Sequence, residues 1–244
     1  MKRILFVAAL WFAAFPAYAQ FSPMVQGPAS GGAITLTNLG TTNPCGSATP
    51  NINPAVSVAA GSFIVVVLYD PENGGSGLVG TVADTKSNTY HLAGVTYQSG
   101  ATGANYSIFY VFNAIALTTS DTITYTSPNS SCSIAMSVAY AATGVLATGD
   151  PLDQFGGNVG SCAGGPSVTL TPTVSGELFV GFVSSSSGSG VGANPSGFSI
   201  PPNTTFSGGN IGGNLTNPGT SAETYNPSVG CSAYGAVMAS FKHS

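Results

Sequence analysis

The spacing of apolar residues constrains this chain more than any other feature of its sequence. No stretch of ten or more residues places apolar side chains at helical spacing, whereas alternating or short apolar runs recur along the whole chain. Glycine, proline, serine, threonine and asparagine fill the gaps between these runs, as they do in the turns between strands. The pattern therefore predicts an all-β protein, an antiparallel β-sandwich of the jelly-roll or immunoglobulin-like type.

The expected strands follow from these runs. They are residues 33–38, 55–59, 62–69, 79–84, 89–98, 105–113, 121–126, 132–141, 167–174, 177–184, 197–206, 222–226 and 232–242. The run SFIVVVLY at 62–69 is apolar at both alternate sets of positions, which is typical of a strand covered on both faces. We therefore expect this strand at the centre of a sheet.

Residues 1–19 have the features of a secretory signal peptide. The basic start MKR, the apolar run ILFVAALWFAAF and the small residues AYA before Gln20 predict cleavage after Ala19. The apolar run is shorter than the roughly 18 residues that span a bilayer, and no other run approaches that length. We expect a protein that is secreted or at the cell surface, with residues 20–244 as a single β-sandwich domain and no membrane insertion.

The mature chain has very little charge. Without Lys2 and Arg3 of the signal it keeps two basic residues, Lys86 and Lys242, against eight acidic ones, a net charge of −6 (2 − 8) with no arginine. A nucleic-acid-binding protein needs several cations to displace phosphate counterions, and a peripheral membrane protein needs a basic face. The composition therefore argues against both classes of partner.

Two similar phrases indicate an internal repeat. SPNSSCSIAMSVAY at 127–140 and NPSVGCSAYGAVMASF at 226–241 each have a cysteine at the start of an expected strand. Each half also has an earlier cysteine, followed by a strand, a glycine-containing turn and a buried strand. We interpret this as a pseudo-repeat with halves at about 33–143 and 160–242.

Four cysteines in an exported chain predict two disulfides, for which sequence alone permits three connectivities. The cysteines are Cys45, Cys132, Cys162 and Cys231. The repeat favours one disulfide within each half, Cys45 with Cys132 and Cys162 with Cys231. A zinc site is the weaker alternative, because the cysteines are isolated and lack paired C-x-x-C spacing.

Several stretches resemble an uncharacterised family of secreted bacterial β-sandwich domains. They are VADTKSNTYHLAG, IFYVFNAI, DTITYT, SVAYAATGV, DPLDQ, SGELFVGF and the final AVMASFK, which together extend over almost the whole mature chain. The family pattern is V-x-D-x-x-x-N-x-Y, then Y-S-G, P-L-D, G-x-L-x-x-G and A-x-F. This chain departs from it with Tyr140-Ala141-Ala142 in place of Tyr-Ser-Gly, and its cysteines are an addition. The resemblance implies an extracellular sandwich and no established activity.

Aromatic side chains are the candidates for carbohydrate binding. The mature chain has no tryptophan, because Trp11 belongs to the signal, but Tyr90, Tyr97, Tyr106 and Tyr110 cluster in consecutive expected strands. A platform formed by these rings would bind sugar faces. The alternative is that they are half-buried sheet residues, which is the usual place of tyrosine in strands.

Two acidic loops are candidates for a structural calcium ion. YDPENGG brings together Asp70, Glu72 and Asn73, and GDPLDQ brings together Asp150 and Asp153. Calcium prefers such oxygen ligands, although neither loop has the regular D-x-D-x-D-G series. Asp-Pro turns are the alternative explanation of both loops. Apart from this ion, no cofactor is expected.

No residue is assigned a catalytic role. His243 is the penultimate residue, which leaves His91 as the histidine suited to act as a base, and an edge or surface histidine is the alternative for it. The chain has no G-x-S-x-G motif. We expect Glu177 to face water at a strand end and Asp84 to accept backbone hydrogen bonds in the DTKSN turn.

These observations predict a secreted, non-catalytic β-sandwich protein. Its expected role is extracellular binding, adhesion or surface and matrix assembly, with a glycan, another extracellular polymer or further copies of itself as partner. The alternative is a secreted hydrolase that acts on polysaccharide or polyester through carboxylates brought together from separate loops.

Overall fold

The computed structural model describes residues 33–42, 49–71, 78–98, 103–128, 136–161, 165–185, 192–200, 210–216, 219–228 and 233–244. The expected signal peptide and all four cysteines lie outside these residues. Across the described ranges every regular element is a strand and every strand pairing is antiparallel, which confirms the all-β prediction. In this part of the chain there is accordingly no helix of the length and hydropathy needed to cross a membrane.

The strands form two larger and two smaller sheets. The first large sheet has the order β1 (Thr35–Thr42), β8 (Met136–Thr143), β3 (Phe63–Asp70), β6 (Ala104–Val111) and β5 (His91–Gln98). The second has the order β12 (Asn210–Thr216), β11 (Leu178–Ser185), β14 (Tyr234–Phe241) and β9 (Leu152–Gly160). The small sheets are β2 (Asn51–Ile52), β7 (Ile123–Thr126) and β4 (Thr81–Asp84), and β10 (Val168–Leu170) with β13 (Glu223–Tyr225).

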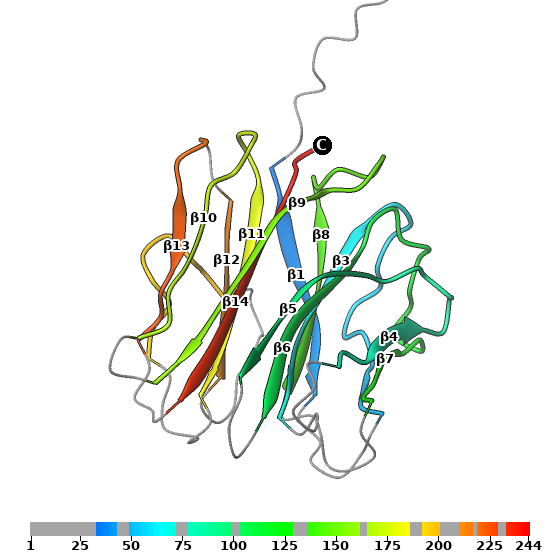
Figure 1. Cartoon of the computed structure of the whole chain (residues 1–244). Coiled ribbons are helices and arrows are strands. Elements are labelled where there is room, and N and C mark those ends of the chain that lie inside the picture. Colours follow the sequence, from blue (N-terminus) through cyan, green and yellow to red (C-terminus); the bar gives the residue numbers. More distant parts are fainter. Residues whose placement is uncertain are drawn as a thin grey trace, which may run out of the picture.

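The four sheets are stacked as layers, with the two large sheets in the middle and one small sheet on each outer side (Figure 1). Alternate residues of the central strands therefore enter different cores. In β3, Val65 and Val67 belong to the core between the large sheets, whereas Ile64 and Val66 belong to the core under the small sheet. All residues of β3 are buried, which confirms the prediction of a strand covered on both faces.

The two halves of the chain have the same connectivity. The first large sheet contains the order β1-β8-β3-β6, and the second has the corresponding order β9-β14-β11-β12. In each half the first long strand pairs with the last, and the short strand that follows it pairs with the one before the last, as β2 with β7 and β10 with β13. Among the described residues of the second half, β4 and β5 have no counterpart. β9 pairs with β14, so the second sheet includes residues before position 160.

Glycines let the two halves approach closely. A Cβ on Gly235 of β14 would overlap the ring of Tyr106, which projects from β6 of the other large sheet. Gly94 of β5 would in the same way meet the ring of Phe155 on β9, at 2.5 Å from its Cγ. Glycine inside a strand is typical of such close approach.

Besides the two-residue strand β2, which lies outside the expected strands, four segments differ from the sequence prediction. Residues 55–59 form a loop with a single bridge at Val58, because only one of its alternating residues enters the core. The described part of 197–206 has only a bridge at Ser199. Strands β9 and β12 were not predicted, since the glycine-rich sequences LDQFGGNVG and NIGGNLT have too few apolar residues to give the pattern.

Candidate functional site

A cavity of about 400 Å³ opens where β6 ends and β5 begins. We call it the His91 cavity. It is lined by Ser87, Asn88, Thr89, His91, Val111, Phe112, Asn113 and Ile115, none of which is Asp, Glu, Lys or Arg. Its size and its mixture of aromatic and polar side chains are typical of small-ligand sites.

His91 is held by two neighbouring aromatic rings. It is the first residue of the edge strand β5 and pairs with Tyr110 of β6, so their side chains lie next to each other. The His91 ring is stacked on Tyr110, with 5.4 Å between centroids, and on Phe112, with 5.2 Å. The Tyr110 hydroxyl donates a hydrogen bond to Asp150 Oδ1 at 2.6 Å, which holds the Tyr110 ring in place. The half-buried imidazole thus has a defined orientation.

Asn88 of the cavity lining is held in place by Asp84, which does not itself line the cavity. Asp84 Oδ1 accepts hydrogen bonds from the backbone N–H groups of Lys86 (2.9 Å) and Asn88 (3.1 Å), which confirms its predicted role in the turn. The Asn88 side chain donates to Asp84 and to the Ile115 carbonyl, and accepts from the Ile115 N–H at 2.6 Å. This amide therefore joins the 84–88 turn to the segment after β6.

Two residues of the cavity have left-handed backbone conformations that non-glycine residues seldom adopt. Ser87 has φ of 61° and Asn113 has φ of 52°. Such conformations cost free energy and cluster at functional sites. Among the described residues, no hydrogen-bond partner occurs for the side chains of Ser87, Thr89, His91 and Asn113, so these groups are available to a ligand.

The four predicted tyrosines do not form one surface. Tyr106 and Tyr110 are buried in the core between the large sheets, at 0% and 2% exposure, because β6 is covered on both faces. Tyr90 is half-buried and donates a hydrogen bond to Asp84 Oδ2 at 3.1 Å, and burial raises its pKa. Tyr97 is half-buried on β5. The sequence missed the aromatic pair that does reach a cavity, His91 and Phe112.

The acidic residues proposed for calcium have protein partners. Asp70 is buried at the end of β3 and accepts hydrogen bonds from the hydroxyls of Tyr125 and Ser127, both at 3.0 Å. Its loop neighbours Glu72 and Asn73 lie outside the described residues, so that site stays a prediction.

Asp150 and Asp153 accept hydrogen bonds from different parts of the protein. Asp150 accepts from the Tyr110 hydroxyl and the Leu152 N–H, whereas Asp153 accepts from the N–H and the hydroxyl of Thr173. Within the described ranges no group of three or more His, Cys, Asp or Glu residues is placed to hold a metal ion.

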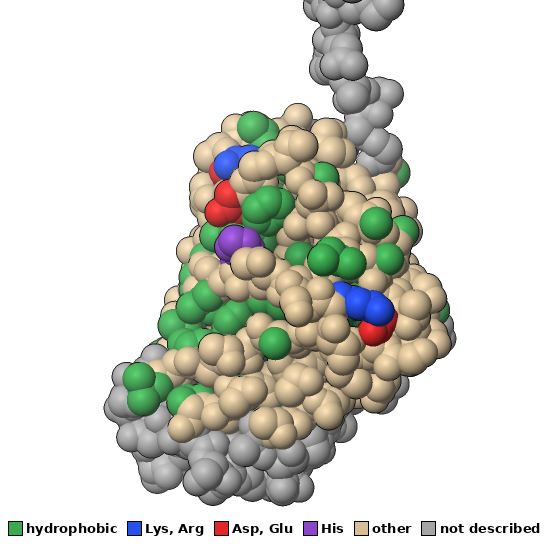
Figure 2. All heavy atoms as spheres, turned by 90° about the vertical axis from the view of Figure 1, so that its right-hand side faces the viewer, with side chains coloured by type: hydrophobic (Ala, Val, Ile, Leu, Met, Phe, Trp, Pro, Cys, Tyr) green, Lys and Arg blue, Asp and Glu red, His purple; other side chains and the backbone are tan. Residues whose placement is uncertain are grey.

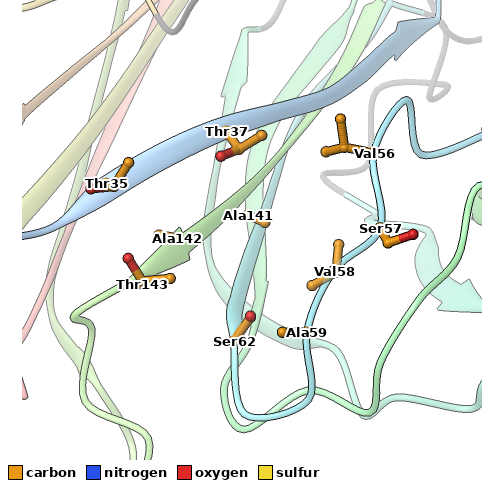
Figure 3. Close-up of a pocket in the computed structure, with 10 residues that line it drawn as sticks. All are labelled: Thr35, Thr37, Val56, Ser57, Val58, Ala59, Ser62, Ala141, Ala142 and Thr143. Carbon is orange, nitrogen blue, oxygen red and sulfur yellow. The ribbon is translucent and has the colours of Figure 1, made fainter.

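A second cavity, of about 200 Å³, lies at the edge of the first large sheet (Figure 3). We call it the β1–β8 cavity. The close-up shows Thr35 and Thr37 of β1 on one side, Val56 and Val58 of the loop on the other, and Ala141 of β8 between them. Ser57, Ala59, Ser62, Ala142 and Thr143 complete the lining. All of these side chains are small and uncharged.

Glu177 is fully buried, and the expectation that it faces water is wrong. It directly precedes β11, and its Oε1 accepts a hydrogen bond from the Val174 N–H at 3.2 Å, while Oε2 is buried with no partner at hydrogen-bond distance. Burial raises the pKa of Glu177, and the negative charge of Asp153 raises it further. Hydrogen bonds from Thr173 and the nearby Lys242 hold the pKa of Asp153 below its ordinary value against the effect of its own burial. Glu177 therefore loses its proton at higher pH than an ordinary glutamate, and Asp153 at lower pH than an ordinary aspartate.

This pair predicts a pH-dependent stability that Glu177→Gln removes. The folded protein holds the Glu177 proton to higher pH than the unfolded chain, so the free energy of unfolding falls as pH rises from about 4.5 through the raised pKa. Glutamine keeps the shape of the protonated acid and does not ionise. We expect this fall to be absent in Glu177→Gln and retained in the control Glu223→Gln, measured as Tm against pH by circular dichroism. Equal pH profiles for the wild type and Glu177→Gln would contradict the assignment.

The described surface offers almost no unpaired positive charge. Lys86 Nζ lies 3.3 Å from Asp121 Oδ1, and Lys242 Nζ lies 3.7 Å from Asp153 Oδ1. On the face in Figure 2, each basic side chain accordingly lies next to an acidic one, among mostly uncharged groups. An anionic ligand would find no free cation among these residues.

No protein-family model, curated protein or solved structure matches this chain.

Proposed function

We propose that this protein is an extracellular binding module that takes an uncharged carbohydrate in the His91 cavity. The observation that carries the proposal is the stacked pair of His91 and Phe112 next to the free polar side chains of Ser87, Thr89 and Asn113. A sugar ring has an apolar face that packs on aromatic rings and hydroxyls that bond to amides and hydroxyls. The cavity supplies both kinds of group.

The charge of the site favours a neutral ligand. The residues that line the His91 cavity carry no Asp, Glu, Lys or Arg, and both lysines of the mature chain are in ion pairs. A sulfated, phosphorylated or acidic glycan would lose its hydration without gaining a charged partner, and burying an unpaired charge is costly. Neutral polysaccharides and their fragments fit this environment better.

The fold and the compartment proposed from the sequence agree with this role. The corresponding strand orders β1-β8-β3-β6 and β9-β14-β11-β12, in which the first strand of each half pairs with the last and the last with the third, support a jelly roll over an immunoglobulin-like sandwich. The signal-like residues 1–19, the four cysteines and the resemblance to secreted bacterial domains support export from the cell. Jelly rolls commonly serve as lectin and capsid domains, so adhesion and assembly stay within the same proposal.

The alternative of a secreted hydrolase has less support. A glycosidase needs two carboxylates on either side of a bound sugar. Glu177 and Asp153 are the acids that lie together, but both are buried, and neither lines the two cavities described above. Substrate would reach them only after the structure opened.

The test is calorimetric titration with neutral hexasaccharides of glucose, xylose, mannose and N-acetylglucosamine, with hexagalacturonate as the anionic control. We expect at least one neutral ligand to bind and His91→Ala to weaken it about tenfold, since roughly 1.4 kcal/mol of lost stacking corresponds to a factor of ten. His243→Ala, which removes the other histidine, should leave the affinity unchanged.

A second variant separates binding from folding. Asn113→Gly removes the amide, and glycine adopts a φ of 52° without strain, so this variant should be at least as stable as the wild type and bind more weakly. If hexagalacturonate binds and no neutral hexasaccharide does, or if His91→Ala binds like the wild type, the proposal is wrong.

A further inference from the structure

We infer that the β1–β8 cavity is a second subsite of the same binding surface, so that the ligand is an oligosaccharide with one ring in each cavity. This inference rests on the proposed function of the His91 cavity. It is carried by the position of the two cavities, by the low ridge between them, and by a comparison of the two halves of the chain.

The two cavities share a wall. Residues 58–62 pair with residues 114–117 through hydrogen bonds from the Val58 N–H to the Leu117 carbonyl (2.8 Å) and from the Ala114 N–H to the Ser62 carbonyl (2.9 Å). Val58 and Ser62 line the β1–β8 cavity, and the residues on either side of Ala114 line the His91 cavity. The two cavities therefore lie on opposite sides of one pair of chain segments.

The ridge between the cavities is low. The exposed turn that forms it is Ala59, Ala60 and Gly61, which carry the smallest side chains. Gly61 has φ of 83°, a conformation that favours glycine, so a larger residue there would strain the turn. A linear ligand that occupied both cavities would cross this turn over methyl groups and backbone.

The described residues of the second half differ from those of the first at the equivalent place. Phe63 pairs with Ala142 at the start of β3, and Leu178 pairs with Phe241 at the start of β11, so these pairs correspond. The residues just outside each pair can then be compared position by position. They differ in size and charge.

Charged side chains fill the equivalent place in the second half. Glu177 stands where the first half has Ser62, and Lys242 stands where it has Thr143. Asp153 reaches into the same cluster and bonds to the loop before β11. The fold alone therefore does not create the β1–β8 cavity. It exists because the first half has small, uncharged residues at these positions.

The lining of this cavity suits one neutral ring. Thr35, Thr37 and Ser62 supply hydroxyl groups, and Val56 and Ala141 supply apolar surface. Its volume of about 200 Å³ is too small for a whole oligosaccharide and holds a single residue of one. Hydroxyl groups beside an apolar wall match the two kinds of surface that a sugar ring presents.

The test is calorimetric titration of the wild type with di-, tetra- and hexasaccharides of the neutral sugar that binds, followed by variants that fill the β1–β8 cavity. Val56→Trp fills it from an exposed loop position, and Ala141→Leu fills it from the strand. We expect the hexasaccharide to bind about tenfold more tightly than the disaccharide in the wild type. In both variants that advantage should vanish while disaccharide affinity is unchanged.

Val174→Trp is the matched control, because Val174 lies on the corresponding loop of the second half and is 42% exposed, as Val56 is. It should bind ligands of every length like the wild type. If Val56→Trp also behaves like the wild type while His91→Ala loses binding, the second subsite is wrong and the His91 site stands. If no neutral oligosaccharide of any length binds, the proposed function fails and this inference with it.

Discussion

Gly235→Ala is expected to lower the free energy of unfolding by about 3 kcal/mol, at the upper end of the cost of overpacking a core. The new methyl group would overlap the ring of Tyr106, which is 0% exposed and has no room to move into solvent. Gly235 lies on β14 and Tyr106 on β6, so the clash falls between the two large sheets. A chain of this size should lose about 6–12 °C in Tm, measured by circular dichroism.

Gly160→Ala is the matched control for this prediction. Gly160 lies on the neighbouring strand β9 and pairs with Tyr234 of β14, and its methyl group would stand 3.1 Å from the hydroxyl oxygen at the far end of that side chain. Its loss should stay below about 1 kcal/mol. In Gly235→Ala/Tyr106→Ala the methyl group enters the space that the ring leaves, so the combined loss should be smaller than the sum by about 1–3 kcal/mol. If the two losses simply add, the face-to-face packing of the sheets is wrong.

The central strands could be predicted because burial on both faces leaves an unambiguous sequence. β3 and β11 read as FIVVVLYD and LFVGFVSS, and every residue of both is buried. The sequences of the edge strands β9 and β12 show no such pattern. Their glycines make room for side chains of other elements: Gly156 lies against Leu170, and Gly213 against Asn194. A strand whose role is to let its neighbours approach carries few apolar residues of its own.

The repeat was the signal that could have found β9. In the first half an expected strand, 33–38, precedes Cys45, and the equivalent strand before Cys162 falls in the region where β9 lies. Residues 150–160 have only scattered apolar side chains, so local periodicity gave no reason to place a strand there. Topology carries over between the halves even where the side-chain pattern does not.

The candidate site was harder to predict, because pairing across strands creates it. His91 and Phe112 are 21 positions apart and meet only because His91 pairs with Tyr110 on β6. The tyrosines were singled out for their residue type, yet Tyr106 and Tyr110 face the second large sheet, which a single sequence does not reveal. Glu177 was expected in water because carboxylates usually are, but it is buried, and this burial together with the charge of Asp153 raises its pKa.

The described strand ends support the cysteine pairing that we propose. Thr42 of β1 pairs with Ser137 of β8, and the sequence reaches Cys45 three residues after Thr42 and Cys132 five residues before Ser137. In an antiparallel pair these two directions point to the same end of the sheet. At about 3.3–3.6 Å per residue, segments of this length suffice to bring two Cα atoms within the roughly 4.4–6.8 Å of a disulfide.

The second half has the same arrangement. Gly160 of β9 pairs with Tyr234 of β14, and Cys162 follows Gly160 by two residues while Cys231 precedes Tyr234 by three. Peptide mapping without reduction should therefore return Cys45 joined to Cys132 and Cys162 joined to Cys231. Pepsin suits this experiment better than trypsin, because residues 20–244 contain only two lysines and no arginine. A Cys45–Cys162 peptide would overturn the pairing.

Removing either proposed disulfide should lower the free energy of unfolding by about 4 kcal/mol, since each would close a long loop of the unfolded chain. The pairing also fixes how substitutions combine. Cys45→Ser/Cys132→Ser removes one disulfide and should lose about as much as Cys45→Ser alone, whereas Cys45→Ser/Cys162→Ser removes both and should lose about 8 kcal/mol. Because a native domain is stable by only about 5–15 kcal/mol, the latter variant should be close to unfolding at 25 °C. Urea denaturation of the wild type, the single variant and the two double variants measures these losses. Equal losses for the two double variants would mean that each half does not have its own disulfide.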